Sequence, residues 1–143
     1  MKATSLNHVS VHAEDLDTSA AFYREFFGMT ELPTPDFGYP VRWLRLGALQ
    51  VHLFQLATPA PKHHHFAVNV DDYEAAFLEA KRRGILDGGP RALPDGSVQL
   101  YIRDPSGNRI ELDWPDGSTL DPDVFGKLPV VPGDPRATLF LDR

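Results

Sequence analysis

Apolar and polar residues alternate at the start of the chain and then recur at helical spacing. Residues 6–11 alternate between the two kinds, which is typical of a strand with one buried face. From Asp15 to Phe27, apolar side chains recur every three or four residues, which predicts an amphipathic helix. Asp15 can cap the beginning of this helix, and Gly28 can end it. Extended segments follow near residues 29–32, 41–46 and 50–56.

The same order of elements returns in the second half of the chain. Residues 65–70 alternate again, Asp72 can cap a second helix, and Gly84 can end it. Asp15 and Asp72 are 57 positions apart, and Gly28 and Gly84 are 56 apart. Further extended segments are expected near residues 85–86, 98–103 and 109–114. Any two amphipathic β-α segments look alike, but the recurrence of all these features in one order favours a duplicated βαβββ unit.

The pattern predicts one α+β domain built from two tandem modules. The first βαβββ module spans residues 3–57, a proline-containing linker spans 58–64, and the second module spans 65–115. The tail, residues 116–143, is rich in Pro, Asp and Gly and is therefore expected to be irregular. One short strand is expected near its end, over residues 137–141.

Charge and composition narrow the possible functions. The 143 residues include 14 basic and 20 acidic side chains, and the net charge of -6 opposes binding to nucleic acid. The chain has no Cys, so any metal must be bound by His, Asp or Glu. No segment has the pattern of a signal peptide, and no apolar run approaches the roughly 18 residues of a membrane span. We therefore expect a cytoplasmic protein that binds neither nucleic acid nor membrane.

Four candidate metal ligands fall at equivalent positions of the two modules. Neighbouring side chains in a strand point to opposite faces, so His8 and His52 are expected opposite the helix of the first module. The same alternation places His65 and Glu111 opposite the helix of the second module. If the two sheets curve toward each other, the four side chains converge. Imidazole and carboxylate ligands suit one divalent ion, such as Fe, Mn, Ni, Co or Zn.

A simpler interpretation competes with this metal site. A single His on a strand is more often a surface residue or a hydrogen-bonded core residue than a ligand. The equivalent placement in both modules is what favours the metal. The other three histidines are expected outside the ligand set. His12 is expected at the rim, His64 on the helix side, and His63 on the face of His65 but two residues further out.

Further side chains share the face of the candidate ligands. By alternation they are Trp43, Arg45, Gln50, Phe54, Gln99, Tyr101 and Arg103. This aromatic and basic set suits a small oxygenated substrate, including an anionic one. For Trp43 and Phe54, packing between the modules is the alternative, and for the arginines the alternative is a solvated surface. We take Trp43, Gln50, Phe54 and Tyr101 as candidate substrate-binding residues.

Three stretches of the chain are similar to one known family. They read LNHVSVHAEDLDTSAAFYREFFGM, HHFAVNVDDYEAAFLEAKRRGI and LYIRDPSGNRIEL. Together they resemble the vicinal oxygen chelate (VOC) superfamily, which includes glyoxalase I, extradiol dioxygenases, fosfomycin-modifying transferases, methylmalonyl-CoA epimerase and bleomycin-binding proteins. The resemblance covers about residues 5–114. It implies a glyoxalase-like fold, in which the paired modules form a curved mixed sheet around a central cleft, and it implies a homodimer.

The resemblance also implies roles for individual residues. The metal positions of the family fall on His8, His65 and Glu111. A fourth position falls on His52, where members usually carry Glu or Gln, so His52 could bind the metal or donate a proton. Glu111 or His52 could then act as the catalytic base. Arg91 matches a basic residue of the fosfomycin transferases, which implies a substrate contact.

From these features we expect a divalent-metal-dependent enzyme whose small substrate chelates the metal through two adjacent oxygens. We favour a glyoxalase-like lyase or isomerase. The alternatives are an extradiol-type Fe(II) ring-cleaving dioxygenase, a fosfomycin-type transferase, and a non-catalytic drug-binding protein of the bleomycin-resistance type. Two departures bear on them: residues 93–95 lack the acid-base His of the dioxygenases, and Leu120 stands where the transferases carry an Arg.

Overall fold

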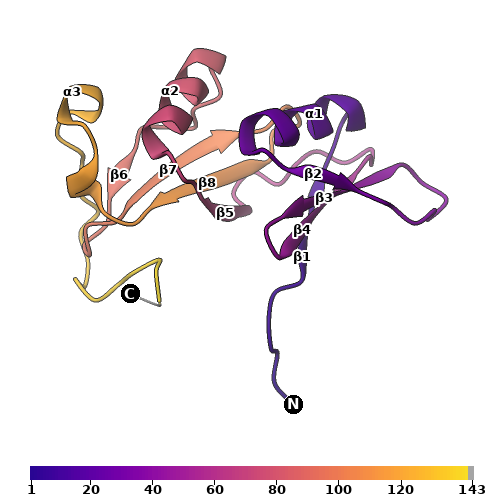
Figure 1. The fold of residues 1–143 in the computed structure, drawn as a ribbon, viewed down its shortest axis with the longest axis horizontal. Helices are drawn as coiled ribbons and strands as arrows, with labels where there is room; N and C mark the ends of the chain where they lie inside the picture. Colours follow the sequence, from indigo (N-terminus) through magenta and orange to yellow (C-terminus); the bar gives the residue numbers. More distant parts are fainter. Residues whose placement is uncertain (142–143) are drawn as a thin grey trace. The chain divides into compact units, whose positions relative to one another are not determined.

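The computed structural model describes residues 1–141, and its contacts separate the chain into two compact units. Unit 1 comprises residues 1–64 and 104–108, and unit 2 comprises residues 65–103 and the chain from residue 109 onward. Residues 142–143 of the predicted tail lie outside the described residues. Helices and strands carry the labels of Figure 1.

Unit 1 is a four-stranded mixed sheet with one helix on one of its faces (Figure 1). Its elements are β1 (His8–His12), α1 (Leu16–Phe27), β2 (Thr30–Leu32), β3 (Val41–Leu46) and β4 (Leu49–Phe54). The strand order is β1-β4-β3-β2, with β1 parallel to β4 and the other neighbours antiparallel. The helix contacts β2, β3 and β4, and its Phe22 and Tyr23 are buried together with Leu44 and Val51 of the sheet. This apolar layer is the core of the unit.

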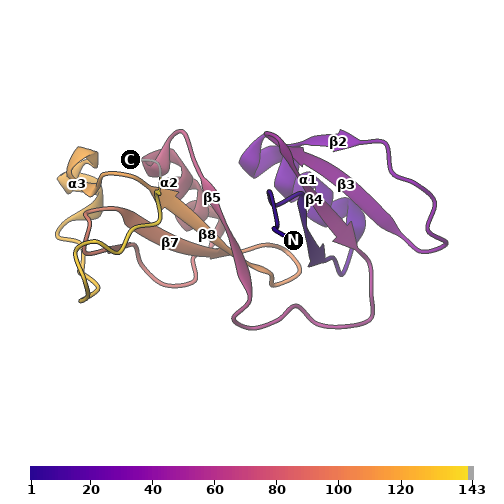
Figure 2. The ribbon, with the colours of Figure 1, turned by 90° about the horizontal axis from the view of Figure 1, so that it is seen from below.

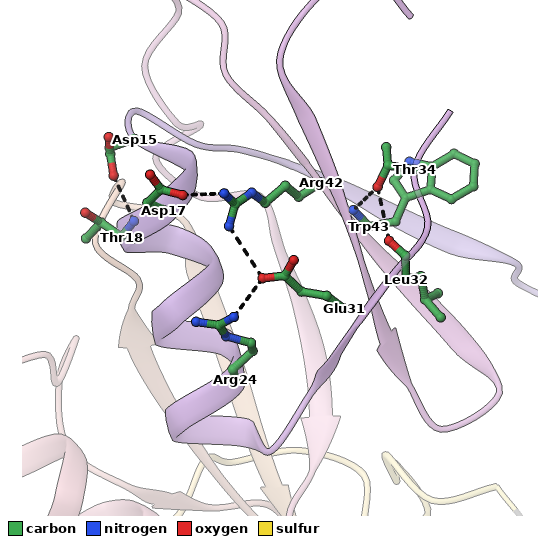
Figure 3. Close-up of polar contacts among 9 residues, drawn as sticks. All are labelled: Asp15, Asp17, Thr18, Arg24, Glu31, Leu32, Thr34, Arg42 and Trp43. Carbon is green, nitrogen blue, oxygen red and sulfur yellow. Dashed lines mark hydrogen bonds and ion pairs between the residues drawn. The ribbon is translucent and has the colours of Figure 1, made fainter. Parts of the chain in front are cut away.

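Charged side chains connect α1 to β2 and β3 of this sheet (Figure 3). Arg42 on β3 pairs with Asp17 on α1 and with Glu31 on β2, and Arg24 on α1 also pairs with Glu31, at 2.9 Å. These groups are exposed or half-exposed, and such pairs contribute little to stability, typically about 0–1 kcal/mol. The apolar layer therefore contributes most of the stability of the unit.

Unit 2 repeats this architecture. Its elements are β5 (His65–Asn69), α2 (Tyr73–Arg83), β6 (Arg91–Ala92), β7 (Val98–Arg103) and β8 (Arg109–Trp114). The strand order is β5-β8-β7-β6, and β5 runs parallel to β8, as β1 does to β4 (Figure 2). Val98, Leu100, Ile102, Ile110 and Leu112 are fully buried on the strands. The predicted α+β fold with two βαβββ modules is confirmed.

The predicted beginnings and ends of both helices are confirmed. The Asp15 carboxylate accepts a hydrogen bond from the Thr18 amide, and Asp72 accepts one from the Ala75 amide. Each helix ends at a glycine in the left-handed region, Gly28 in α1 and Gly84 in α2, where φ is 66° and 68°. A side chain with a Cβ would be strained at these two positions. No helix of residues 1–141 is long and apolar enough to cross a membrane.

The edge of the second sheet differs from the predicted one. A strand was expected near residues 85–86, but Leu86 forms only an isolated bridge to Ile102. The edge strand is β6, which pairs with β7 after the Gly88-Gly89-Pro90 sequence. Proline has no amide hydrogen to donate and the two glycines favour a turn, so regular pairing begins only after them.

The tail also differs from the prediction. Residues 137–141, expected as a strand, form turns in which the Thr138 hydroxyl accepts a hydrogen bond from the Phe140 amide. Local bonds of this kind satisfy the backbone without a partner strand. The tail contains instead a 3-10 turn, η1 (Gly117–Thr119), and a short helix, α3 (Pro122–Phe125). Asp121 caps α3, and its Phe125 ring lies 4.9 Å from the Phe77 ring of α2, so α3 covers part of α2.

The turn between β7 and β8, residues 104–108, belongs to unit 1. The Tyr23 hydroxyl donates to the Asp104 carboxylate at 2.9 Å, and the Asn108 amide donates to the His12 carbonyl at 2.5 Å. Burial raises the pKa of Asp104, and the pKa of Tyr23 rises well above its usual value because of burial and the neighbouring carboxylate. The polar DPSGN sequence therefore has a structural role in unit 1.

Candidate functional site

Three rings stack on the face of unit 1 opposite α1. The ring of His52 lies between those of His8 and Trp43, with ring centroids 4.2 Å and 4.3 Å away. The planes of His52 and Trp43 differ by 7°, and those of His8 and His52 by 16°. Strand register explains the stack, because Trp43 is the β3 partner of His52 and β1 flanks β4 on its other side. The sequence-predicted neighbours His8, His52 and Trp43 are thus brought together.

Two side-chain amides contact the stacked histidines. Asn7 Oδ1 lies 2.9 Å from His8 Nδ1, and Gln50 Oε1 lies 2.9 Å from His52 Nε2. His52 is 6% exposed, and this burial, followed by the charge of His8, lowers its pKa. His52 is therefore held as a neutral ring at neutral pH.

A hydrogen bond holds the backbone of Trp43, and stacking on His52 holds its ring. Its amide donates to Thr34 Oγ1 at 3.1 Å, and that hydroxyl donates to the Leu32 carbonyl (Figure 3). Its indole Nε1 is buried and has no hydrogen-bond partner within residues 1–141. Phe54 lies two residues beyond His52 on β4, and its ring contacts Tyr39 at 5.9 Å. Trp43 thus contacts the candidate ligand His52 directly, whereas Phe54 packs against the loop before β3.

In unit 2 the corresponding face carries a hydrogen-bonded carboxylate. Glu111 on β8 is only 4% exposed, and its Oε2 lies 3.0 Å from His65 Nε2. The Tyr101 hydroxyl donates to the same oxygen at 2.8 Å. The rings of His65 and Tyr101 meet edge to face at 5.2 Å. Burial, together with Glu111, raises the pKa of Tyr101 to about 12, so its hydroxyl stays a proton donor at neutral pH.

A second buried carboxyl group lies next to Glu111. Asp113 is 4% exposed, and burial raises its pKa to about 7, with a further contribution from the charge of Glu111 and a hydrogen bond to it. Asp113 was not among the predicted site residues. Alternation along β8 puts it on the face of Glu111, so the sequence did contain the signal.

Arginines surround Tyr101. The Arg109 guanidinium lies 3.7 Å from the centre of the Tyr101 ring, and both Arg109 and Arg103 pair with Asp87. A hollow of about 160 Å³ lies beside them, lined by Asp87, Gly88, Gly89, Arg91, Gln99, Tyr101 and Arg109. Arg91 has no carboxylate partner in the described part of the chain. The predicted contacts Arg91 and Tyr101 thus share one cavity, with an unpaired positive charge in it.

The candidate ligands form one pair in each unit: His8 with His52, and His65 with Glu111. Within residues 1–141, no three His, Cys, Asp or Glu side chains gather closely enough to hold a metal ion, so the four-residue set stays a prediction. His63 and His64, expected outside the set, are exposed.

The chemistry of both pairs fits a divalent ion. An amide oxygen on His8 and a hydroxyl on Glu111 are the kind of outer partners that orient metal-binding side chains. Imidazole nitrogen and carboxylate oxygen suit the borderline ions Fe, Mn, Ni, Co and Zn.

Comparison with known proteins points to one family. The family model described as Glyoxalase/Bleomycin resistance protein/Dioxygenase superfamily matches residues 5–112. Mitochondrial methylmalonyl-CoA epimerase of Mus musculus is 28% identical over 136 residues, which cover 78% of this chain and 74% of the epimerase. Metallothiol transferase FosB of Staphylococcus epidermidis is 28% identical over 121 residues, covering 78% of this chain and 82% of FosB.

A solved structure supports the same assignment. A glyoxalase family protein from Bacillus anthracis superposes with a TM-score of 0.66 and 29% identity, covering 79% of this chain and 96% of that protein. Sequence and fold therefore agree on the superfamily, whereas the similar proteins differ in the reactions that their names give.

Proposed function

The chain belongs to the glyoxalase/bleomycin resistance protein/dioxygenase superfamily, and from that premise we propose that it is a divalent-metal-dependent enzyme. Its substrate would be a small molecule that offers two adjacent oxygens to the metal. The observation that carries this proposal is the pairing of His8 with His52 and of His65 with Glu111 on equivalent strands of the two modules. Within the superfamily we favour a glyoxalase-like lyase or isomerase, because the similarity to an epimerase supports an isomerase.

His8, His65 and Glu111 would hold the ion, with His52 as a fourth ligand or as an acid-base group. A bound divalent ion supplies a Lewis acid that polarises an oxygen of the substrate. The donor set of neutral imidazoles and one carboxylate leaves a net positive charge on such a site. That charge favours a substrate with anionic or strongly polar oxygens.

Glu111 is a candidate for proton transfer, and the side chains of Tyr101 and His65 position it. A lyase or isomerase of this kind must remove a proton next to a carbonyl group and return a proton to the substrate. The Glu111 carboxylate or His52 can accept that proton if it is displaced from the metal, and the Tyr101 hydroxyl, which donates to Oε2, holds Glu111 in place. The Oε2 atom also faces His65, so Glu111 is fixed from two sides before the substrate binds.

The hollow beside Tyr101 supports an anionic substrate. Arg91 and Arg109 line it, and Asp87, the one acidic residue of its lining within residues 1–141, is already paired with Arg103 and Arg109. A carboxylate or similar oxyanion could pair with Arg91, because a guanidinium binds such groups through two parallel hydrogen bonds. We propose that Arg91 binds the charged end of the substrate.

One alternative reaction has specific support. Similarity to a metallothiol transferase and the unpaired Arg91 both favour transfer of a thiol to a small anionic substrate. The same metal and the same carboxylate would serve that reaction. A thiol-consumption assay with an epoxide substrate distinguishes it from isomerisation.

Metal analysis followed by assays tests the proposal. Protein purified without chelator should contain one divalent ion per site, and metal-loaded protein should isomerise a methylglyoxal–thiol adduct or exchange the α-proton of methylmalonyl-CoA with solvent deuterium. Aerobic incubation with catechol tests ring cleavage. Protein that holds no metal, and whose melting temperature no added divalent ion raises, would contradict the metal-dependent enzyme and favour the drug-binding alternative. We also propose a homodimer, which sedimentation equilibrium measures directly.

A further inference from the structure

The two stacked histidines of unit 1 each face the oxygen of a side-chain amide, but through different ring nitrogens. Asn7 Oδ1 faces Nδ1 of His8, and Gln50 Oε1 faces Nε2 of His52. An amide oxygen only accepts hydrogen bonds, so the ring nitrogen that faces it must carry the hydrogen. A neutral imidazole has a single N–H, and its other nitrogen then has a free lone pair.

We propose that Asn7 and Gln50 are positioning residues that hold His8 and His52 in opposite tautomers, which leaves Nε2 of His8 and Nδ1 of His52 as the free lone pairs. Only a nitrogen without hydrogen can bind a metal or accept a proton. The two amides therefore select which atom of each ring is available for chemistry. This gives Gln50 a role toward His52 in addition to the substrate contact expected from alternation.

Stacking fixes the plane of the His52 ring, so the hydrogen bond to Gln50 has to choose only between two orientations of that ring. The rings of His8 and Trp43 cover its two faces at 4.2 Å and 4.3 Å, so they fix the plane of the ring. A half-turn about the Cβ–Cγ bond keeps that plane but exchanges the nitrogens with carbons. Stacking alone does not distinguish these two orientations. The hydrogen bond to Gln50 does, because only one orientation places an N–H opposite Oε1.

His8 provides the more demanding test of the proposal. The neutral histidine side chain in water favours the tautomer with hydrogen on Nε2, which is the tautomer that Gln50 selects in His52. Asn7 selects the less common one in His8, with hydrogen on Nδ1. Histidines that bind a metal through Nε2 typically donate Nδ1–H to an oxygen acceptor in this way. The link to metal binding rests on the proposed function, whereas the tautomers themselves do not.

Long-range proton–nitrogen NMR of the ¹⁵N-labelled, metal-free full chain at pH 8 reads both tautomers directly. We expect hydrogen on Nδ1 of His8 and on Nε2 of His52. Asn7→Ala should lower the ratio of the Nδ1–H to the Nε2–H form of His8 by about fivefold, as expected for loss of one neutral hydrogen bond. Gln50→Leu should lower the ratio of Nε2–H to Nδ1–H in His52 by a similar factor.

Conservative variants separate positioning from a general structural effect. Asn7→Asp and Gln50→Glu, made instead of the Ala and Leu variants, keep an oxygen acceptor and should retain the wild-type tautomers. If the Gln50 amide were instead a donor to His52, the wild-type chain would carry the hydrogen on Nδ1 of His52, and Gln50→Glu would move it to Nε2. Gln55→Leu is the matched control, because the Gln55 amide donates to the Glu14 carbonyl and its removal should leave both rings unchanged.

Two results would overturn the proposal: hydrogen on Nε2 of His8 in the wild-type chain, or hydrogen on Nδ1 of His52 in the wild-type chain. Addition of Zn²⁺ then tests the proposed function separately. Expected tautomers with no zinc-induced shift at either ring would support the positioning role and contradict the metal site.

Discussion

The two units place different chemistry on the same scaffold. In both, the first strand runs parallel to the last, with His8 beside Gln50 in unit 1 and His65 beside Arg109 in unit 2. An aromatic residue on the neighbouring strand lies opposite the second candidate ligand, as Trp43 does opposite His52. In unit 2 the equivalent pair is Tyr101 and Glu111.

The side chains at these positions interact in different ways. Trp43 stacks on a neutral ring, whereas Tyr101 donates a hydrogen bond to a buried carboxylate. Where unit 1 has Phe54 beyond its ligand, unit 2 has Asp113 beyond Glu111. The two units thus carry candidate ligands at equivalent positions and on the same face, with two imidazoles in unit 1 and an imidazole and a carboxylate in unit 2.

The helix-facing sides of the two sheets should contribute to stability in the same way, because both bury apolar side chains. Leu53 and Leu112 are both fully buried, at matching positions of β4 and β8. Leu53→Ala and Leu112→Ala should each lower the free energy of unfolding by about 2–5 kcal/mol. Urea denaturation measures both, with Leu56→Ala at an exposed site as the control. A loss under about 1 kcal/mol in either variant would show that its sheet does not depend on this layer.

Glu111 should carry the anionic half of the metal site. Glu111→Gln keeps the size of the side chain but removes its charge, so it should weaken Zn²⁺ binding by at least about 100-fold, more than removal of an orienting residue usually does. Competition with a chromophoric chelator measures the affinity. His64→Gln is the control, because His64 is exposed and should leave the affinity unchanged. The opposite outcome for the two variants would overturn the assignment of faces.

Tyr101 should affect metal binding through its hydrogen bond to Glu111. Tyr101→Phe keeps the ring beneath Arg109 but removes the hydrogen bond to Glu111 Oε2, so we expect metal affinity to fall about tenfold. The same chelator competition checks this, with Tyr39→Phe as the control because Tyr39 packs on Phe37 and Phe54 in unit 1. Equal affinity in the wild-type chain and Tyr101→Phe would make Tyr101 a substrate contact only.

The stability of unit 1 should depend on a hydrogen bond to the turn of residues 104–108, which lies outside the βαβββ segment of this unit in the sequence. Tyr23→Phe removes the hydrogen bond to Asp104 and leaves a buried carboxylate with one partner fewer, at a cost of about 1–3 kcal/mol. Thermal and urea unfolding measure the loss. Tyr39→Phe, at an exposed site, should change stability little.

The buried carboxyl group of unit 2 should make stability depend on pH. The pKa of Asp113 is raised to about 7 in the folded chain, so between about pH 4 and pH 7 the folded state binds more protons than the unfolded state. Stability therefore falls as pH rises through this window and levels off above it. In metal-free protein, Asp113→Asn should flatten the profile and gain stability relative to wild type at pH 8. A wild-type profile that rises from pH 5 to pH 8 would contradict this.

Local sequence patterns predicted the elements and their faces. The caps Asp15 and Asp72 and the glycine ends Gly28 and Gly84 lie where the spacing placed them, because capping and left-handed glycine depend on neighbouring residues only. Alternation was enough to bring His8 beside His52 and His65 beside Glu111 within their units, since register follows from the pairing of buried faces.

Contacts between distant segments were not predictable in the same way. The ion pairs of Asp87 with Arg103 and Arg109, and the bond from Tyr23 to Asp104, leave no periodic pattern in the sequence. Charged surface residues look alike whether or not they meet. The helix α3 could have been found from Asp121-Pro122, an N-cap followed by proline at the first helical position, which the overall composition of the tail obscured.

The central claim is that one divalent ion draws ligands from both units. X-ray absorption spectroscopy of the zinc-loaded chain counts the imidazoles bound to the metal. We predict that His8→Gln and His65→Gln each remove one imidazole from the same zinc site, although one residue lies in unit 1 and the other in unit 2. A spectrum that changes in only one of these variants, or in neither, would contradict the claim.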